Sequence, residues 1–310
     1  MKKSEKKFGY TTRLWRTAKG ARWAIYPNLN ARDNEWRGIF RDVRFRRALS
    51  LGINRYEINQ VFYYGLSRET NNSLLRESPL FNKEYSSRWI KFNLVAANKL
   101  LDEIGLEKRN DDGIRLLPSG KPMEITVVFS TEENEPADIL ELVSDTWKKI
   151  GIKLLSKPLN REVMRNRIFS GNALMSMWSG LENGIANAEA SPKELAPTSQ
   201  QQLQWPMWGQ YVETSGKSGE PTDMDVPKKL FALSLLWQTA ETTELKRKIW
   251  GQMLDLYTNN VFSIGIISSV PQVVVVNSSL KNIPNEGIYN WDPGAHLSLI
   301  HISEPTRPER

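Results

Sequence analysis

Tryptophan is the residue type most able to form a ligand site in this 310-residue chain, because eleven tryptophans outnumber ten phenylalanines and nine tyrosines. Trp178 is the last residue of a candidate strand, and Trp205 and Trp208 lie in a proline-rich segment. An aromatic ring with one polar edge suits the wall of a ligand site. These three residues are therefore candidate ligand contacts, and packing in the hydrophobic core is the alternative for each.

Paired carboxylates could carry out glycoside hydrolysis, which needs a general acid and a second carboxylate on either side of one bond. Two adjacent pairs occur, Asp102 with Glu103 and Asp111 with Asp112. Neighbours in sequence point in different directions, and both pairs fall at an expected helix end or turn. We therefore interpret them as surface residues and assign no catalytic residue.

Cysteine and histidine are too scarce for several kinds of site. The absence of cysteine excludes disulfides, thiolate nucleophiles and cysteine-bound zinc. The two histidines, His296 and His301, lie in the last fifteen residues, and a histidine metal site or a Ser/His/Asp triad would need one of them. Gly209 and the Gly216-Lys217-Ser218 run have the wrong spacing for a phosphate-binding loop. We expect no metal and no cofactor.

Positive charge is concentrated at the start of the chain. The formal net charge is +7, but residues 1–50 hold 14 Lys or Arg against 4 Asp or Glu, which leaves −3 for the remainder. The arginines between Arg41 and Leu51 alternate with apolar residues, so we interpret them as a solvated helix face, with phosphate binding as the alternative. No nucleic-acid partner is expected. The longest apolar stretch, 261–276, is interrupted by polar residues and is too short to span a bilayer.

Expected strands and helices alternate through most of the chain. Asn93 and Asn160 can each cap a helix, because their side chains can accept hydrogen bonds from the first turn. This alternation predicts an α/β layered domain with a largely parallel sheet. A long polar segment, 181–227, shows no regular pattern. The expected strands are 21–28, 123–130, 152–155, 173–178, 262–267 and 273–276, and the expected late helices are 228–238 and 242–259.

Several sequence landmarks occur in the order found in one protein family. The run Phe40-Arg-Asp-Val-Arg-Phe-Arg-Arg-Ala-Leu-Ser-Leu-Gly-Ile-Asn-Arg55 resembles a motif of the extracellular solute-binding proteins of family 5. This family includes oligopeptide- and dipeptide-binding components of ABC importers. The helix 96–105, the run Trp147 to Ile152 and the late helix followed by 261–276 are similar to further family features. The resemblance extends from about residue 20 to about residue 297.

The resemblance implies a periplasmic-binding-protein-like fold of the venus-flytrap class II type, with two lobes. Residues 38–272 would form a largely complete second lobe, residues 1–37 a remnant of the first lobe with a crossing strand, and residues 273–297 the returning strand. Family members are longer at the N-terminus and begin with an export signal. We therefore expect a C-terminal fragment in which most of the first lobe is missing. Residues 298–310 resemble translated sequencing adapter and are predicted to be a non-native tail.

The resemblance also implies a ligand site. In peptide-binding members a strand ends in Trp-x-x-Asp, where the tryptophan lines the pocket and the aspartate pairs with the peptide's α-ammonium. Here Trp178 is retained, Leu181 takes the place of the aspartate, and Glu182 is a substitute one residue later. The strand 23–30 resembles a hinge-adjacent strand that reaches the ligand. The implied ligand-binding residues are Trp178, Ser179, Glu182, Asn183, Tyr26 and Asn28, in addition to Trp205 and Trp208.

The function implied by the resemblance is that of a substrate-binding component of an ABC transporter, periplasmic and monomeric, without enzymatic activity. It would bind a small polar solute, an oligopeptide in the first instance, and deliver it to ABC permease subunits in the membrane. Because Leu181 replaces the aspartate, an oligosaccharide is the alternative ligand. Two alternatives come from other classes: a glycan-active enzyme with a tryptophan-lined cleft, and a nucleic-acid binder that uses the N-terminal arginines.

Overall fold

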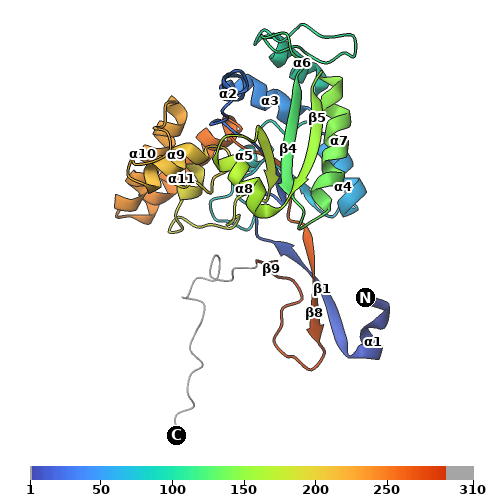
Figure 1. Ribbon diagram of the computed structural model, residues 1–310. Helices are drawn as coiled ribbons and strands as arrows, with labels where there is room; N and C mark the ends of the chain where they lie inside the picture. Colours follow the sequence, from blue (N-terminus) through green and yellow to red (C-terminus); the bar gives the residue numbers. More distant parts are fainter. Residues whose placement is uncertain (1, 291–310) are drawn as a thin grey trace.

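A six-stranded mixed sheet organises the larger part of the computed structural model, which describes residues 2–290 (Figure 1). The strand order is β3-β7-β2-β6-β4-β5. β4 pairs in parallel with β5 and β6, whereas the other neighbours pair antiparallel. The prediction of a largely parallel sheet is therefore wrong, because β2 and β7 each run antiparallel to both of their neighbours in the sheet. The strands are β2 (Trp23–Pro27), β3 (Arg68–Glu69), β4 (Glu124–Ser130), β5 (Lys153–Leu159), β6 (Met175–Trp178) and β7 (Ile264–Ser268).

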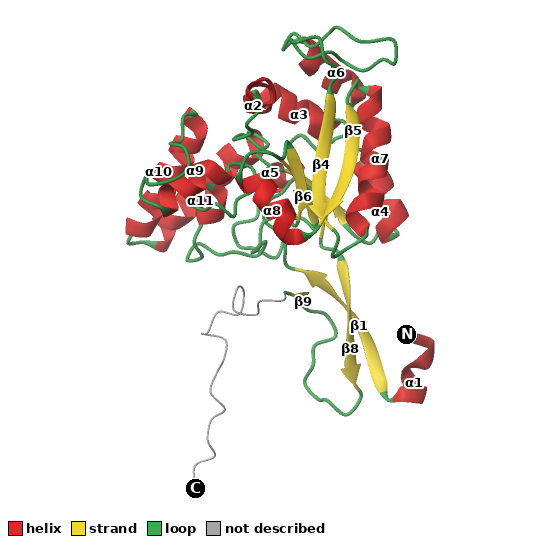
Figure 2. Ribbon diagram, viewed as in Figure 1, coloured by secondary structure: helices red, strands yellow, loops and turns green. Residues whose placement is uncertain are grey.

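Helices cover both faces of this sheet (Figure 2). Along β4, Ile125 and Val127 belong to the same buried cluster as residues of α3, α6 and α7, while Val128 packs with α8 on the opposite face. This follows from the alternation of side chains along a strand. The helices of this region are α2 (Asn34–Arg41), α3 (Val43–Leu51), α4 (Arg55–Tyr63), α5 (Lys83–Ser87), α6 (Leu94–Asp102), α7 (Glu135–Lys149) and α8 (Arg161–Phe169).

The predicted helix starts are confirmed at both capping asparagines. The Asn93 side chain accepts a hydrogen bond from the Ala96 amide at 2.9 Å, and the Asn160 side chain accepts one from the Glu162 amide at 2.9 Å. Asn160 thereby fixes the first turn of α8 directly after β5. This turn lies close to the carboxyl ends of β4 and β6, where it can contribute side chains to a site.

A helical cluster packs beside the sheet, at the left of Figure 2. It has its own core, in which the Trp205 ring lies 4.9 Å from the Phe262 ring and 6.3 Å from the Trp208 ring, between centroids. The segment 181–227, expected to lack regular structure, contributes one α-helix and one short 3-10 helix to this cluster. The elements are η2 (Lys193–Leu195), α9 (Pro206–Glu213), α10 (Asp225–Thr239) and α11 (Thr243–Asn259).

A small second sheet lies below the larger part in Figure 1 and is joined to it by two chain crossings. It contains β1 (Tyr10–Thr17), β8 (Pro271–Asn277) and β9 (Ile288–Tyr289), in the order β8-β1-β9, and is preceded by η1 (Lys2–Ser4) and α1 (Glu5–Phe8). The crossings are residues 18–22, between β1 and β2, and residues 269–270, between β7 and β8. In residues 2–290 no helix is long and apolar enough to cross a membrane.

The larger part begins within the segment 1–37, which was predicted to hold the remnant of a first lobe and a crossing strand. β2 lies in this segment and pairs with β6 and β7 in the middle of the large sheet. All five of its residues are buried, so the larger part begins before Trp23. At the other end, β8 begins at Pro271, close to the predicted boundary after residue 272. Residues 291–297, the predicted tail 298–310 and both histidines, His296 and His301, lie outside the described residues.

Two arginines of the family-like motif are buried, and for Arg46 this contradicts the interpretation as a solvated helix face. Arg46 and Arg55 are each 1% exposed. Arg46 donates hydrogen bonds to the Asn260 carbonyl at 2.9 Å and the Phe40 carbonyl at 2.5 Å. The guanidinium of Arg55 donates to the carbonyls of Gly265, Ser50 and Ile90 and to the Ser50 hydroxyl. Arg46 therefore connects α3 to Asn260, which precedes β7, and Arg55 connects α4 to β7 itself.

Replacing Arg55 should destabilise the fold strongly. Arg55→Met leaves the carbonyls of Gly265, Ser50 and Ile90 without this donor in the interior, and an unsatisfied buried acceptor costs about 1–3 kcal/mol. We expect a loss of at least about 3 kcal/mol in the free energy of unfolding, measured by urea titration with far-UV circular dichroism. Arg44→Met is the control, because Arg44 is 43% exposed beside Asp42 and should lose under about 1 kcal/mol. Equal losses would contradict a structural role for Arg55.

Candidate functional site

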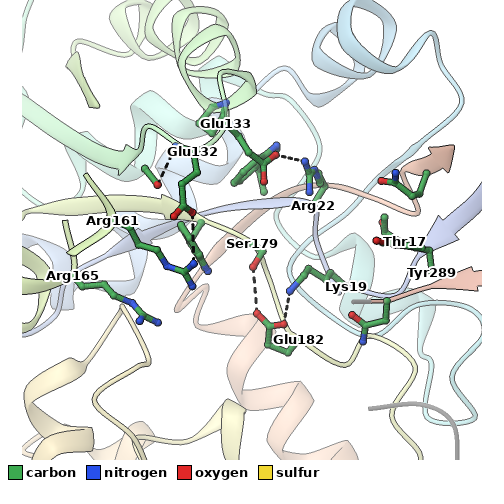
Figure 3. A pocket seen from close by; sticks show the side chains of 16 residues that line it. Thr17, Lys19, Arg22, Glu132, Glu133, Arg161, Arg165, Ser179, Glu182 and Tyr289 are labelled. Atoms are coloured by element: carbon green, nitrogen blue, oxygen red, sulfur yellow. Dashed lines mark hydrogen bonds and ion pairs between the residues drawn. The ribbon is translucent and has the colours of Figure 1, made fainter. Parts of the chain in front are cut away.

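A cavity lies where the small sheet meets the larger part (Figure 3). It measures about 730 Å³ and is lined by Thr17 and Tyr289 from the small sheet and by Ser130 and Trp178 from the larger part. Ser130 and Trp178 are the last residues of β4 and β6, which run parallel, so their carboxyl ends meet at one edge of the sheet. Ligands of open α/β sheets bind outside this edge. We call this cavity the cleft.

A second cavity of about 480 Å³ lies next to the cleft and is called here the inner chamber. Both cavities are lined by Arg165, Trp178, Ser179 and Glu182. The remaining wall of the inner chamber comes from Asn72, β2, the loop after β6, the segment 193–204, α9 and α11. The loop after β6 therefore separates the two cavities and presents side chains to both.

The structure brings together four of the residues predicted to bind ligand. Trp178, Ser179 and Glu182 line both cavities. Tyr26 lines the inner chamber, and its hydroxyl donates a hydrogen bond to the Ser179 carbonyl at 2.6 Å. This bond connects β2 to the loop after β6, so it helps to hold Ser179 in the wall.

Two predicted residues lie away from the cavity walls and have structural contacts. Asn28 is 1% exposed, and its side-chain amide donates to the carbonyls of Ile168 and Ala173 at 3.1 Å each. The Asn183 side chain accepts a hydrogen bond from the Ile185 amide at 3.2 Å. Neither asparagine lines the cleft or the inner chamber.

Trp205 and Trp208 are core residues, so the interpretation that they form a ligand wall is corrected. Both are 0% exposed and pack with Tyr257 and Phe262. The Trp205 ring nitrogen donates to the Gln202 side chain at 3.0 Å, within the same turn. Core packing was the alternative for both tryptophans, and it is the correct one. Their aromatic partners, Tyr257 and Phe262, lie some fifty residues later in the sequence, so the sequence segment around the tryptophans did not reveal them.

Ion pairs, missed by the sequence-based reasoning, organise the charged wall of the cleft. Glu182 pairs with Lys19, Glu133 with Arg22, and Glu132 with Arg161 at 3.7 Å. The guanidinium of Arg161 lies 5.1 Å from the centre of the Trp178 ring, a distance typical of a cation–π contact. The sequence contained one signal for these cations, the helix cap at Asn160. A helix that begins near the edge of the sheet places residues 161 and 165 on the same helix face.

The residue in the aspartate position of the family motif is apolar and packed. Leu181 is 3% exposed, and its amide donates to the Asn72 side chain at 2.8 Å. The next amide, that of Glu182, donates to both carboxylate oxygens of Glu194, at 2.9 and 3.1 Å. Burial raises the pKa of Glu194 to about 7, and the nearby charge of Glu182 acts in the same direction. In residues 2–290 no group of three or more His, Cys, Asp or Glu is placed to hold a metal ion.

Comparison with known proteins places this geometry in one family. The model of bacterial extracellular solute-binding proteins, family 5, matches residues 2–199. A probable ABC transporter-binding protein of Deinococcus radiodurans is 32% identical over 118 residues, which cover 37% of this chain and 19% of that protein. A periplasmic alpha-galactoside-binding protein of Rhizobium meliloti is 20% identical over 274 residues, 87% of this chain and 37% of that protein.

Solved structures of similar proteins confirm the expected periplasmic-binding-protein-like fold. An oligopeptide-binding protein, OppA, has a TM-score of 0.77 and 27% identity, and the match covers 93% of this chain and 47% of that one. The periplasmic binding protein MelB of Agrobacterium fabrum, in complex with stachyose, has a TM-score of 0.69 and 18% identity, over 86% of this chain and 40% of that one. The chain thus spans less than half the length of these relatives.

The pKa of Glu194 predicts a specific dependence of stability on pH. A folded-state pKa of about 7, above the ordinary value of 4.5, means that the folded protein binds this proton more tightly than the unfolded chain. The corresponding stabilisation is present below the unfolded-state pKa and is lost as pH rises towards 7. Between pH 5 and pH 8 the unfolding free energy of the wild-type chain should therefore decrease because of Glu194. In Glu194→Gln this decrease should be smaller by about 1–3 kcal/mol. Parallel stability curves from chemical denaturation of the two proteins would contradict this.

Proposed function

Because the chain belongs to the bacterial extracellular solute-binding proteins of family 5, we propose that it captures a polar solute for an ABC importer. The observation that carries the proposal is the cleft, whose walls come from both sides of the two chain crossings. A solute that contacts both walls stabilises the closed arrangement by the free energy of the added contacts. Closure around the solute is then the signal that permease subunits in the membrane recognise.

The contacts in the cleft support binding rather than hydrolysis. A glycan-active enzyme needs two carboxyl groups, one on either side of the bond to be cleaved. The three cleft carboxylates, Glu132, Glu133 and Glu182, are each held in an ion pair with Arg or Lys. The partly buried Trp178 offers an aromatic surface beside them, which suits stacking of a peptide side chain or a sugar ring.

An oligopeptide is the first solute class that we propose. It is supported by the likeness to the oligopeptide-binding protein, which has the higher identity of the two structures compared. In the wall of the inner chamber, Asn72, Ser199 and Gln201 offer amide and hydroxyl groups, which suit a peptide backbone. The protein would act as a monomer in the periplasm.

An oligosaccharide is the second candidate, and one observation favours it. The usual partner of a peptide ammonium is replaced by buried Leu181, and the neighbouring Glu182 is already paired with Lys19. A ligand ammonium would have to displace Lys19, whereas a neutral sugar would leave the ion pair intact. The alpha-galactoside-binding relative and the stachyose complex of MelB support this class.

Substitution of Trp178 tests whether the cleft is the binding site. Trp178→Ala should lower affinity for the bound solute by about 1–3 kcal/mol, the range for a lost aromatic anchor, with little change in melting temperature. Binding is measured by calorimetry against a panel of oligopeptides and galacto-oligosaccharides. Trp205→Ala is the matched control, because emptying a core site should cost about 3–5 kcal/mol of stability. A large loss of stability in Trp178→Ala with unchanged affinity would refute the assignment.

Substitution of Glu182 tests whether the site binds a ligand ammonium. Because Lys19 holds the carboxylate, we expect Glu182→Gln to change affinity for an oligopeptide and for its N-acetylated counterpart by the same factor. Calorimetry with both peptides measures this. A loss confined to the peptide with a free amine would show instead that Glu182 binds the ammonium.

A further inference from the structure

Among residues 2–290, the charged side chains that line the cleft form ion pairs with one another, except for one cation. Four cationic and three acidic side chains line it. Each acid has a cationic partner: Glu182 has Lys19, Glu133 has Arg22, and Glu132 has Arg161. Within residues 2–290, the remaining cation, Arg165, makes no side-chain hydrogen bond, ion pair or ring contact. Figure 3 shows its guanidinium without a dashed line.

Arg165 is positioned to meet a bound solute. It lies one turn after Arg161 on α8, on the same face of the helix, and Arg161 covers the Trp178 ring. Its side chain is partly buried and lines both the cleft and the inner chamber. A solute stacked on Trp178 would therefore come within reach of this guanidinium whichever cavity it extends into.

The acids of the inner chamber do not neutralise Arg165. Glu194 accepts hydrogen bonds from the amide of Glu182, and Glu213 accepts one from the amide of Gln200 at 2.9 Å. Neither carboxylate forms an ion pair with Arg165. The donors of the Arg165 guanidinium are thus left to the solvent or to a ligand.

A guanidinium presents its donors in a planar fork that matches the two oxygens of a carboxylate, and such charge-assisted pairs are stronger than neutral hydrogen bonds. We propose that the cleft selects solutes that carry a carboxylate, which Arg165 binds beside Trp178. This inference rests on the proposed solute-binding function and adds the charge of the solute to it. The carboxylate can be the C-terminus of a peptide or the acid group of a uronic-acid sugar, and the two sources share the same chemistry at Arg165.

The experiment compares acids with neutral counterparts of the same shape. The probes are a tripeptide and its C-terminal amide, and trigalacturonic acid and its methyl ester, titrated by calorimetry into the chain. We expect the acid of one pair to bind about 10- to 100-fold more tightly than its neutral counterpart, the range for a hydrogen bond to a charged group. The pair that shows this preference identifies the source of the carboxylate.

Two variants assign the preference to one side chain. Arg165→Gln should remove the preference for the acid and leave the affinity for the neutral probe unchanged. Arg167→Gln is the matched control, because Arg167 is on the same helix but lines neither cavity, and it should retain the preference. Melting temperatures of both variants verify that they fold.

Each remaining outcome counts against one or both proposals. Equal binding of acid and neutral probes by the wild-type chain would overturn the inference and leave solute binding in place. A preference that persists in Arg165→Gln would also overturn it. Failure of every probe to bind would count against the proposed function as well.

Discussion

Two buried guanidinium groups hold together segments that are far apart in the sequence, and the central sheet depends on them. β7 lies between β2 and β3, so residues 260–268 must return beside residues 23–27 after more than two hundred residues of intervening chain. Arg46 donates a hydrogen bond to the Asn260 carbonyl, and Arg55 donates one to the Gly265 carbonyl. Hydrogen bonds from a charged donor are stronger than those between neutral groups. Because β2 and β7 both lead directly into the chain crossings, their pairing also fixes where the small sheet meets the large one.

The position of the cleft follows from that pairing. The crossing segment 18–22 carries Lys19 and Arg22, which pair with Glu182 after β6 and Glu133 before α7. The ion pairs therefore connect a crossing segment to the cleft wall, rather than two residues of the same wall. Removing the glutamate from such a pair leaves the charge of Lys19 or Arg22 without its partner, and both of these side chains are partly buried. A solute is bound at lower cost when it leaves these pairs intact and uses the aromatic surface and the free hydrogen-bonding groups.

Signals within a few residues of one another predicted helix starts correctly. Pairing between segments far apart in the sequence could not be predicted from such signals. The caps at Asn93 and Asn160 depend only on residues two or three positions away, and both were predicted. The antiparallel pairing of β2 with β7 depends on segments at opposite ends of the chain, so the alternation of strands and helices suggested a parallel sheet instead. The start of α9 was missed because Pro206 lies in the proline-rich segment 181–227, for which no regular structure was expected, although proline is favourable in the first turn of a helix. In the site, Trp178 and Glu182 came from the family motif, whereas Arg165 could not be distinguished from the other arginines before their partners were known.

The basic start of the chain shows that the role of a charged side chain depends on the group with which it pairs. Residues 1–50 carry most of the excess positive charge, which by composition alone suggested a nucleic-acid surface. In the structure Arg37 pairs with Glu220 and Arg41 with Asp223, so this segment is held to acids that lie far later in the sequence. Other cations of the same segment bind buried carbonyls or the acids of the cleft. These contacts use the positive charge for connections within the fold. Among the described residues that line the cleft, the same kind of pairing leaves Arg165 as the cation without an acidic partner, at the place where a solute would bind.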